Sequence, residues 1–248
     1  MGANFGHCVT GIRERLGANV LLHHIPLGSH DEFVGMCDLI ENVAYIWKEE
    51  GKDSPWETVP LDQVKSRFNF ATSRDNDWID ELPKLRQDAL ETALALDDDA
   101  FMTFVETGEF DPAMLKACIR KGTVTGQLVP VFCGSSFKNK GVQQLLDAVI
   151  AYMPYPGENG GISMVDPDGN VIGTQEVSDD APARALAFKV INDQFGPLTF
   201  ARIYSGVIKK GDTLMNVTRG KKERVGRIVE VQADSTKDIE EVRAGDIC

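Results

Sequence analysis

The chain has 248 residues, 42% of them hydrophobic, which is enough for one large domain or two ordinary ones with an extensive core. Its formal net charge is −12, from 38 acidic and 26 basic residues, and this argues against a free-standing nucleic-acid-binding protein such as a DNA binder. No apolar run approaches the roughly 18 residues of a membrane-spanning helix and no signal peptide is evident, so we expect a soluble cytoplasmic protein without a membrane partner.

The first part of the chain predicts one helix followed by strands. Apolar residues recur at helical spacing over 5–16, and Gly17 suits the end of a helix. The segment 20–47 has a strand-like pattern with period-2 spacing. Residues 49–60 contain a glycine and two prolines, so we expect an excursion between elements there.

Helices are expected in the middle of the chain. One apolar stripe runs through 85–96. The run Asp97-Asp98-Asp99 can cap a second helix, which should end near Gly108. A third helix should begin at Asp111-Pro112, because Asp suits the N-cap and Pro suits the first helical position.

The last part of the chain predicts a strand, a turn and a helix, and then a second domain. The strand is expected over 128–132 and the helix over 141–152. Residues 154–182 are rich in Pro, Gly and Asp, which is typical of a linker or an exposed excursion at a domain boundary. Short strands of an unfinished β-barrel or sandwich are expected over 185–191, 199–204, 212–216 and 223–231.

Three stretches approach nucleotide-binding motifs, but a wrong residue type or an unsuitable context argues against each. The stretch 206–213 has Asp in place of the phosphate-binding Lys, so we expect a hairpin turn. The Asp-x-x-Gly pattern at 166–169 lies in an acidic, turn-rich region and predicts an ordinary type I or II turn. Asn139-Lys140 begins a guanine-reading motif, but Val142 replaces its carboxylate.

The histidines and cysteines do not form a recognisable catalytic or metal-binding pattern. His23 and His24 are adjacent, and adjacent residues on a strand point to opposite faces, so we do not expect them to bind one ion. All four histidines lie within 7–30 without catalytic spacing, and the five cysteines lack a CxxC pair. We therefore expect reduced thiols, no metal site and no catalytic residue.

Two charged surfaces are candidate binding sites. An acidic helical surface would be either a solvated face or a docking site for a basic partner helix, and it includes Asp88, Glu91 and Asp98. The concentrated positive patch would be either a plain exposed hairpin or a site of phosphate contacts with RNA. Its basic residues are Arg219, Lys221, Lys222, Arg224 and Arg227.

Three parts of the chain carry a family resemblance: the turn and helix over 133–154, the strands over 189–246 and the N-terminal residues 2–19. The first part begins with Cys133-Gly-Ser-Ser-Phe-Lys-Asn-Lys-Gly-Val142. Together they resemble translation elongation factor G. In that family the equivalents are the last guanine-nucleotide motif, the start of a β-barrel second domain and the segment just after the Asn-Lys-x-Asp motif.

The resemblance covers nearly the whole chain and implies its fold. The implied class is α/β, the C-terminal portion of a P-loop GTPase domain with an inserted α+β subdomain, followed by a partial all-β barrel domain. Residues 1–154 would be the late GTPase domain, with the inserted subdomain at about 20–125. Residues 155–182 would be the linker, and 183–248 the incomplete barrel. We expect marginal stability or association, because the strand 128–132 would lack neighbours.

The resemblance also implies binding roles for the candidate residues. The turn residues Ser135, Ser136 and Phe137 would close over a guanine base, with the backbone amide of Ser136 directed at the guanine oxygen. The acidic surface would meet the stalk protein of the large ribosomal subunit. The positive patch would rest on small-subunit ribosomal RNA.

The family uses GTP and Mg²⁺ to drive ribosomal translocation in protein synthesis. The 248 residues lack the P-loop, both switch segments and Asn-Lys-x-Asp, so we expect this polypeptide alone to be inactive, without bound nucleotide or metal. Whether it is an enzyme is left open. Alternatives are a related translational GTPase (a release factor, a ribosome-protection protein or a ribosome-recycling paralogue) and a non-catalytic ribosome-binding adaptor.

Overall fold

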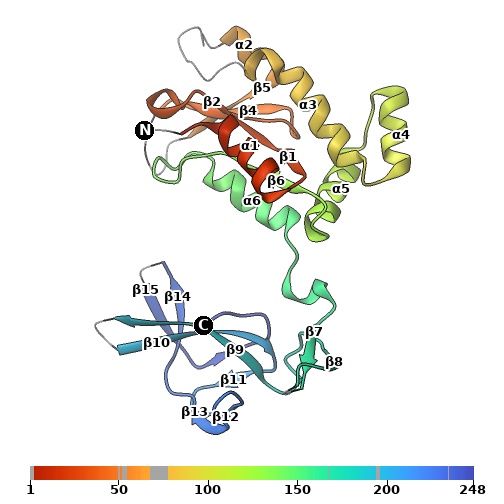
Figure 1. Cartoon of the computed structure of the whole chain (residues 1–248). Coiled ribbons are helices and arrows are strands. Elements are labelled where there is room, and N and C mark those ends of the chain that lie inside the picture. Colours follow the sequence, from red (N-terminus) through yellow and green to blue (C-terminus); the bar gives the residue numbers. More distant parts are fainter. Residues whose placement is uncertain are drawn as a thin grey trace. The chain divides into compact units, whose positions relative to one another are not determined.

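The computed structural model describes the residues 3–49, 51, 55–67, 78–166, 168–193, 196–233 and 235–248. The chain divides into two compact units, Met1–Met153 and Pro154–Cys248 (Figure 1). Both helices and many strands are present, which confirms the predicted mixed α/β class. Among the described residues, no helix combines the length and the apolar character that crossing a bilayer requires.

The first unit begins with helix α1 (Phe5–Leu16), as predicted. The Asn4 side chain caps it by accepting a hydrogen bond from the backbone N of His7 at 2.7 Å. Gly17 ends it in the left-handed conformation, with φ of 64°. Strand β1 (Val20–Leu22) follows and pairs in parallel with β6 (Val129–Val131), a strand more than 100 residues further along the chain. This pairing corrects the expectation that the strand at 128–132 lacks neighbours.

A four-stranded antiparallel sheet lies between β1 and β6 in the sequence, with the order β2-β3-β4-β5. Its strands are β2 (His24–Leu27), β3 (Gly35–Asp38), β4 (Val43–Trp47) and β5 (Trp56–Pro60), with the 3₁₀ helix η1 (His30–Glu32) between the first two.

Strand β5 corrects the predicted excursion over 49–60, of which residues 50 and 52–54 lie outside the described part of the chain. Trp56 pairs across the strands with Trp47, and the centroids of the two rings are 5.7 Å apart. Cross-strand aromatic pairs of this kind stabilise a sheet edge despite nearby prolines.

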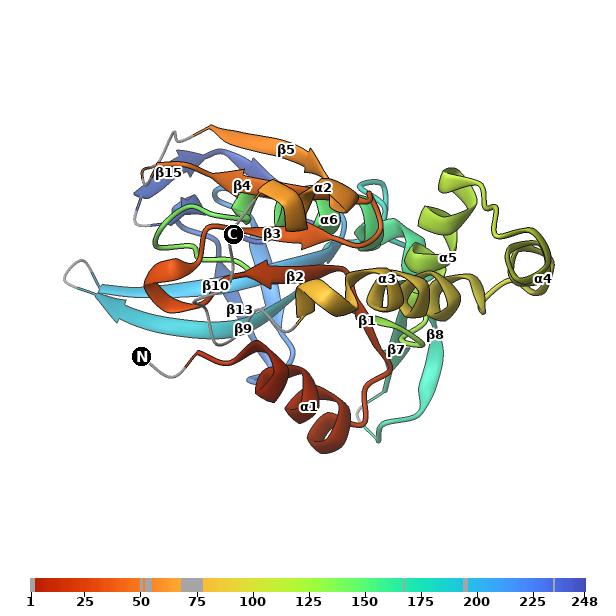
Figure 2. The same ribbon diagram turned by 90° about the horizontal axis from the view of Figure 1, so that it is seen from above.

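Helices cover the sheet. Helix α2 (Leu61–Arg67) lies by β4 and β5, and α3 (Trp78–Leu94) lies beside α5 (Pro112–Val124) (Figure 2). Helix α4 (Asp98–Thr107) connects α3 to α5 in sequence.

The predicted helix ends in this region are confirmed. Asp97 caps α4 by accepting a hydrogen bond from the N of Ala100 at 3.0 Å, and Asp111 caps α5 through the N of Ala113 at 2.9 Å. Gly108 ends α4 with φ of 75°. Local capping chemistry therefore sets these boundaries.

Helix α6 (Val142–Tyr152) follows β6 and packs against α5. Its buried face includes Ala148 and Tyr152, which join the core of the first unit. The opposite face is apolar and exposed, with Leu146 at 58% and Ile150 at 80% exposure.

The second unit begins with 3₁₀ helix η2 (Pro156–Asn159) and a hairpin of β7 (Ile162–Val165) and β8 (Val171–Gln175). The predicted linker at 155–182 is therefore partly a β-hairpin. Its turn at 166–169 is an ordinary turn, as expected: the backbone N of Gly169 donates to the O of Asp166 at 3.0 Å. Pro167 lies outside the described residues.

The remaining strands of the second unit form antiparallel pairs, and those described do not close into a barrel. Its small core consists of Ile203, Ile208, Ile228 and Val242. The pairs are β9 (Arg184–Asp193) with β10 (Gly196–Ser205), β11 (Ile208–Lys209) with β16 (Glu241–Val242), β12 (Thr213–Asn216) with β13 (Lys221–Arg224), and β14 (Ile228–Gln232) with β15 (Ser235–Ile239).

Two strand predictions in this unit need correction. The strand predicted over 223–231 is divided between β13 and β14. The N of Val225 makes the last hydrogen bond beside the β12–β13 pair, to the O of Asp212, and the chain then leaves that pair before β14 begins. The stretch 206–213 is a turn but not a simple hairpin, since β11 and β12 pair with different strands.

Candidate functional site

The turn between β6 and α6 is short and closed by backbone hydrogen bonds. The N of Ser135 donates to the O of Lys140 at 2.9 Å, and the N of Lys140 donates to the O of Ser135 at 3.0 Å. The N of Asn139 also donates to the O of Ser136 at 3.2 Å. These bonds fix the backbone of the predicted guanine-binding residues.

The base of this turn is packed tightly. A Cβ on Gly134 would lie 2.7 Å from the O of Lys140, so only glycine fits there. The Lys140 side chain is buried, and its Nζ donates to the backbone O of Phe33 at 2.8 Å. The turn is thereby attached to the loop before β3.

The tip of the turn is exposed. Ser136 is exposed, the Phe137 side chain is 99% exposed, and Ser135 is half-buried. The structure therefore places all three predicted turn residues together at the surface, within reach of a ligand from solvent.

The acidic candidates lie on two helices. Asp88 and Glu91 are three residues apart on α3 and share a face. Glu91 accepts a hydrogen bond from Nε2 of Gln87 at 2.8 Å. Asp98 lies in the first turn of α4, where a carboxylate is stabilised by the positive end of the helix dipole. The charge of Asp98 thus has a structural explanation without a partner.

The positive patch is built on the β12–β13 hairpin. Arg219 lies in its turn and donates its backbone N to Oδ1 of Asn216 at 3.1 Å. Lys221, Lys222 and Arg224 are exposed on β13, where successive side chains point to opposite faces. Lys222 and Arg224 therefore share one face of the strand, and Lys221 lies on the other.

Arg227 differs from the other four bases. Its Nε lies 2.6 Å from Oδ1 of Asp238 on β15, and among the described residues it is the only one of the five in an ion pair. Its charge is therefore partly neutralised within the protein.

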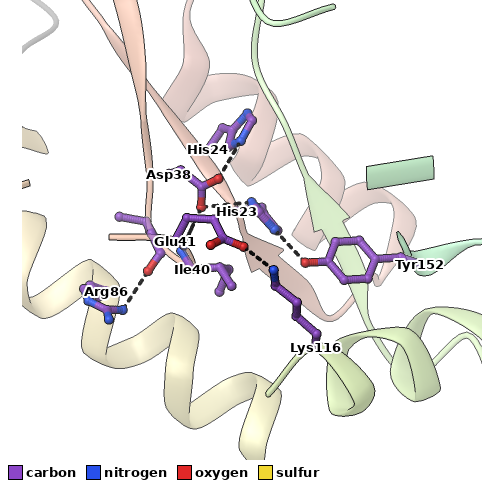
Figure 3. Close-up of polar contacts among 9 residues, drawn as sticks. His23, His24, Asp38, Ile40, Glu41, Arg86, Lys116 and Tyr152 are labelled. Carbon is purple, nitrogen blue, oxygen red and sulfur yellow. Dashed lines mark hydrogen bonds and ion pairs between the residues drawn. The ribbon is translucent and has the colours of Figure 1, made fainter. Parts of the chain in front are cut away.

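A buried cluster of His23, His24 and Asp38 corrects the expectation that the two histidines point apart. Nδ1 of His23 lies 3.4 Å from Oδ1 of Asp38, and Nε2 of His24 lies 3.3 Å from Oδ2 of the same carboxylate (Figure 3). All three residues are buried.

The alternation rule fails because no single strand contains both histidines. Strand β1 ends before His23, and β2 begins after it. The backbone N of His23 donates to Val131 on β6, while its O accepts from the N of Leu39, just after β3. The chain changes sheets at His23, and both rings reach the same carboxylate.

Several contacts hold this cluster in place. Oδ1 of Asp38 accepts hydrogen bonds from the backbone N of Ile40 at 3.0 Å and of Glu41 at 2.9 Å. Nε2 of His23 lies 3.0 Å from the hydroxyl of Tyr152 on α6 (Figure 3). The carboxylate and the first imidazole are thus oriented by neighbouring elements.

Burial controls the protonation of the cluster. Desolvation lowers the pKa of His23 to about 4, although the charge of Asp38 acts in the opposite direction. Burial by itself would raise the pKa of Asp38, but the hydrogen bond with His24 and the nearby imidazoles hold that pKa below its ordinary value. At neutral pH, His23 is therefore neutral and Asp38 ionised.

Comparison with known proteins extends over the whole chain. It is 43% identical over 251 aligned positions to elongation factor G 2 of Vibrio cholerae serotype O1, covering 100% of this chain and 34% of that protein. It is 40% identical to elongation factor G of Gluconobacter oxydans, and the alignment covers 99% of this chain and 34% of that protein. The chain spans about a third of the length of the curated relatives that it matches.

Two further matches concern domains and fold. A family model described as elongation factor Tu domain 2 matches residues 196–248. A crystal structure of a protein from Thermus thermophilus has the same fold, with a TM-score of 0.68 at 23% identity, over 99% of this chain and 32% of that one. The chain is related over its whole length to elongation factor G.

Proposed function

We propose that this chain is part of an elongation-factor-G-like translational GTPase, which uses GTP and Mg²⁺ to drive ribosomal translocation in the cytoplasm. The observation that carries the proposal is 43% identity to elongation factor G 2 of Vibrio cholerae over the complete chain. Because the identity extends through both units, the two proteins share the order of their domains and not only a single domain.

We further propose that residues 1–154 are the late part of a GTPase domain, with a subdomain inserted at about 20–125. The parallel pairing of β1 with β6 supports this assignment, because parallel neighbours are typical of α/β domains and need a long connection; it would move the start of the insertion from residue 20 to just after β1. Residues 155–182 would connect it to an incomplete barrel at 183–248, which the elongation factor Tu domain 2 match supports.

Ser135, Ser136 and Phe137 would form one wall of the guanine pocket. A fixed turn with an exposed tip can present the backbone N–H of Ser136 to a carbonyl oxygen on the base, without the energetic cost of ordering a loop. The side chain of Ser136 is not required for such a contact.

A chimaera tests the function: in the Vibrio cholerae relative, the segment that matches this chain is replaced by this chain. The chimaera should hydrolyse GTP on ribosomes and support translocation. Ribosome-stimulated hydrolysis without translocation would indicate a paralogue with another role, and ribosome binding without hydrolysis would favour an adaptor.

Two substitutions at residue 136 in that chimaera test the pocket. Ser136→Pro removes the backbone N–H and should weaken GTP binding by roughly tenfold, as expected for one lost hydrogen bond. Ser136→Ala keeps the N–H and should leave affinity unchanged, as measured by titration of a fluorescent GTP analogue. Equal affinities of the two variants would contradict this role.

The purified chain itself should not bind GTP in the same titration. A base-reading turn supplies no contact to the phosphates, which provide most of the binding site in P-loop proteins. Saturable binding of GTP by the chain alone would contradict the proposal.

The exposed bases Arg219, Lys221, Lys222 and Arg224 would contact small-subunit ribosomal RNA, with Arg227 as a weaker contributor. The double substitution Lys221→Glu and Lys222→Glu should lower ribosome affinity and flatten its dependence on salt concentration. Arg227→Glu is the control: as one charge reversal against two, it should have less than half of the effect, because Asp238 already pairs with that charge. Co-sedimentation with ribosomes at several salt concentrations measures both.

The acidic residues Asp88, Glu91 and Asp98 would lie at the contact with the large-subunit stalk protein. Because that protein is acidic, the contact requires apolar or basic groups on one side to offset like-charge repulsion. Asp88→Lys with Glu91→Lys should weaken stalk binding, because these carboxylates would face basic side chains of that protein. Stronger binding would mean that they only repel the partner.

A further inference from the structure

The His23–His24–Asp38 cluster brings two imidazoles and one carboxylate close enough to share a metal ion. The potential ligand atoms all lie within 4.8 Å of one another. Nδ1 of His23 lies 3.4 Å from Oδ1 of Asp38, and Nε2 of His24 forms a hydrogen bond with Oδ2 at 3.3 Å, which is longer than the common distance of about 2.9 Å. Bonds of about 2.05 Å around a tetrahedral zinc ion place neighbouring ligands roughly 3.3 Å apart, so the three ligand atoms would draw closer together when an ion binds.

The imidazoles also have unused nitrogen atoms. Nδ1 of His23 and Nδ1 of His24 are buried and form no hydrogen bond within the described structure. Nδ1 of His23 is nevertheless directed at Asp38. A buried polar atom without a hydrogen bond is energetically costly, and a metal ion between His23 and Asp38 would satisfy it.

The surrounding contacts orient the ligands in the manner of a metal centre. The second nitrogen of His23 contacts the hydroxyl of Tyr152, and two backbone amides hold Oδ1 of Asp38. These contacts leave Nδ1 of His23 and Oδ2 of Asp38 as ligands, together with Nε2 of His24. Outer partners of this kind fix ligand geometry in known metal sites.

Access and charge favour a cation. The cluster lines a cavity of about 270 Å³, whose other lining residues include Glu41, Asp147 and Lys116. Lys116 pairs with Glu41 at 2.7 Å, so the carboxylates of Asp38 and Asp147 leave the local charge negative. The cavity offers an open position for a water or an additional ligand.

We propose that Nδ1 of His23, Nε2 of His24 and Oδ2 of Asp38 bind one divalent transition-metal ion of the zinc type, with a fourth position facing the cavity. Two imidazoles and one carboxylate suit zinc, whereas calcium and magnesium prefer oxygen ligands throughout. The ion would join the β1–β2 junction to the end of β3.

Metal titration of the complete chain tests this proposal. After treatment with a chelator, the chain should bind one Zn²⁺ in calorimetric titration, with a rise in its melting temperature. Co²⁺ should give the visible absorption bands of a tetrahedral site.

Conservative variants distinguish a built site from adventitious binding. His24→Gln keeps a donor toward Asp38, and Asp38→Asn keeps the oxygen that accepts the two backbone amides. Each removes one ligand and should lower zinc affinity by about 100-fold or more, whereas Tyr152→Phe alters an outer contact and should lower it by about 10- to 100-fold. His30→Gln removes an exposed histidine and should change nothing.

Three results would overturn the proposal. One is the absence of saturable zinc binding by the parent chain. The second is equal affinity in the parent, His24→Gln and Asp38→Asn chains, which would indicate binding at exposed groups such as His7 or Cys8. The third applies if circular dichroism shows that both His24→Gln and Asp38→Asn are unfolded. The Tyr152→Phe variant then decides: a zinc affinity equal to that of the parent chain would reject the site.

Discussion

The two units differ in how much apolar surface they bury. The first unit has a continuous core that reaches from Leu21 on β1 to Ile119 on α5, both fully buried. Among the described residues, the core cluster of the second has four buried members, while Phe188 and Val190 on β9 are at least half exposed. Since apolar burial is the main favourable contribution to folding, we expect the first unit to be the more stable.

Polar interactions do not compensate for this difference. In the second unit, Arg243 pairs with Asp179 at 2.8 Å and Arg227 with Asp238 at 2.6 Å, but all four side chains are largely exposed. Exposed ion pairs contribute little because water and salt screen them. The comparison teaches that many paired strands do not replace a filled core.

Thiol reactivity should show the largest contrast. Cys37 is fully buried in the first unit, and burial raises the pKa of its thiol to about 12, so it stays a thiol at pH 8. Alkylation of Cys37 should be at least about 1000-fold slower than that of exposed Cys8, because it requires unfolding. Half-buried Cys248 in the second unit should react at an intermediate rate.

Mass spectrometry of peptides after timed alkylation measures these three rates. Equal rates at Cys37 and Cys248 would mean that the two units open equally often, and the comparison would then fail.

Ile203→Ala should unfold the second unit. It removes one of the four buried side chains of that core, and such a loss costs about 2–5 kcal/mol. The β-strand signal in circular dichroism should fall, while the fluorescence transition in urea stays in place, since all three tryptophans (Trp47, Trp56 and Trp78) belong to the first unit. A shifted tryptophan transition would show that the units unfold together.

Ile119→Ala should lower the free energy of unfolding of the first unit by the same amount, about 2–5 kcal/mol, without unfolding it. The larger core leaves enough stability to retain the native state. The tryptophan transition should move to a lower urea concentration at unchanged slope. Complete loss of the transition would place the first unit at the same marginal stability as the second.

Asp97→Ala should have the smallest of these effects, about 1 kcal/mol, because it removes one hydrogen bond at the start of α4. Asp98→Ala is the control, since Asp98 contributes only through the helix dipole. Urea unfolding followed by tryptophan fluorescence should rank the two losses in this order. The reverse order would mean that charge outweighs capping at this helix end.

The sequence predicted the elements whose causes are local. Asp97, Gly108 and Asp111 act within one helical turn, so their residue types were enough to place the ends of α4 and α5. The turn at 135–137 was also located from local pattern and resemblance. Its exposure fits the proposed contact with a base.

Features with distant causes were missed. Whether His23 and His24 face one carboxylate depends on the partners of β1 and β2, and these lie on separate segments of the chain. Strand β5 and the β7–β8 hairpin depend on cross-strand neighbours rather than on their own composition. One local signal of this cluster was present in the sequence: Asp38 stands before the turn between β3 and β4, where its carboxylate accepts hydrogen bonds from two backbone amides.

The parallel pairing of β1 with β6 has a consequence for how such a chain can change. Val20 lies opposite Val129, so the polypeptide departs from one small sheet and returns to it beside its point of departure. Everything between these strands is an excursion with adjacent ends, and adjacent ends tolerate exchange of the intervening segment. The excursion can therefore be enlarged, shortened or given a ligand of its own while the register of the two strands is preserved.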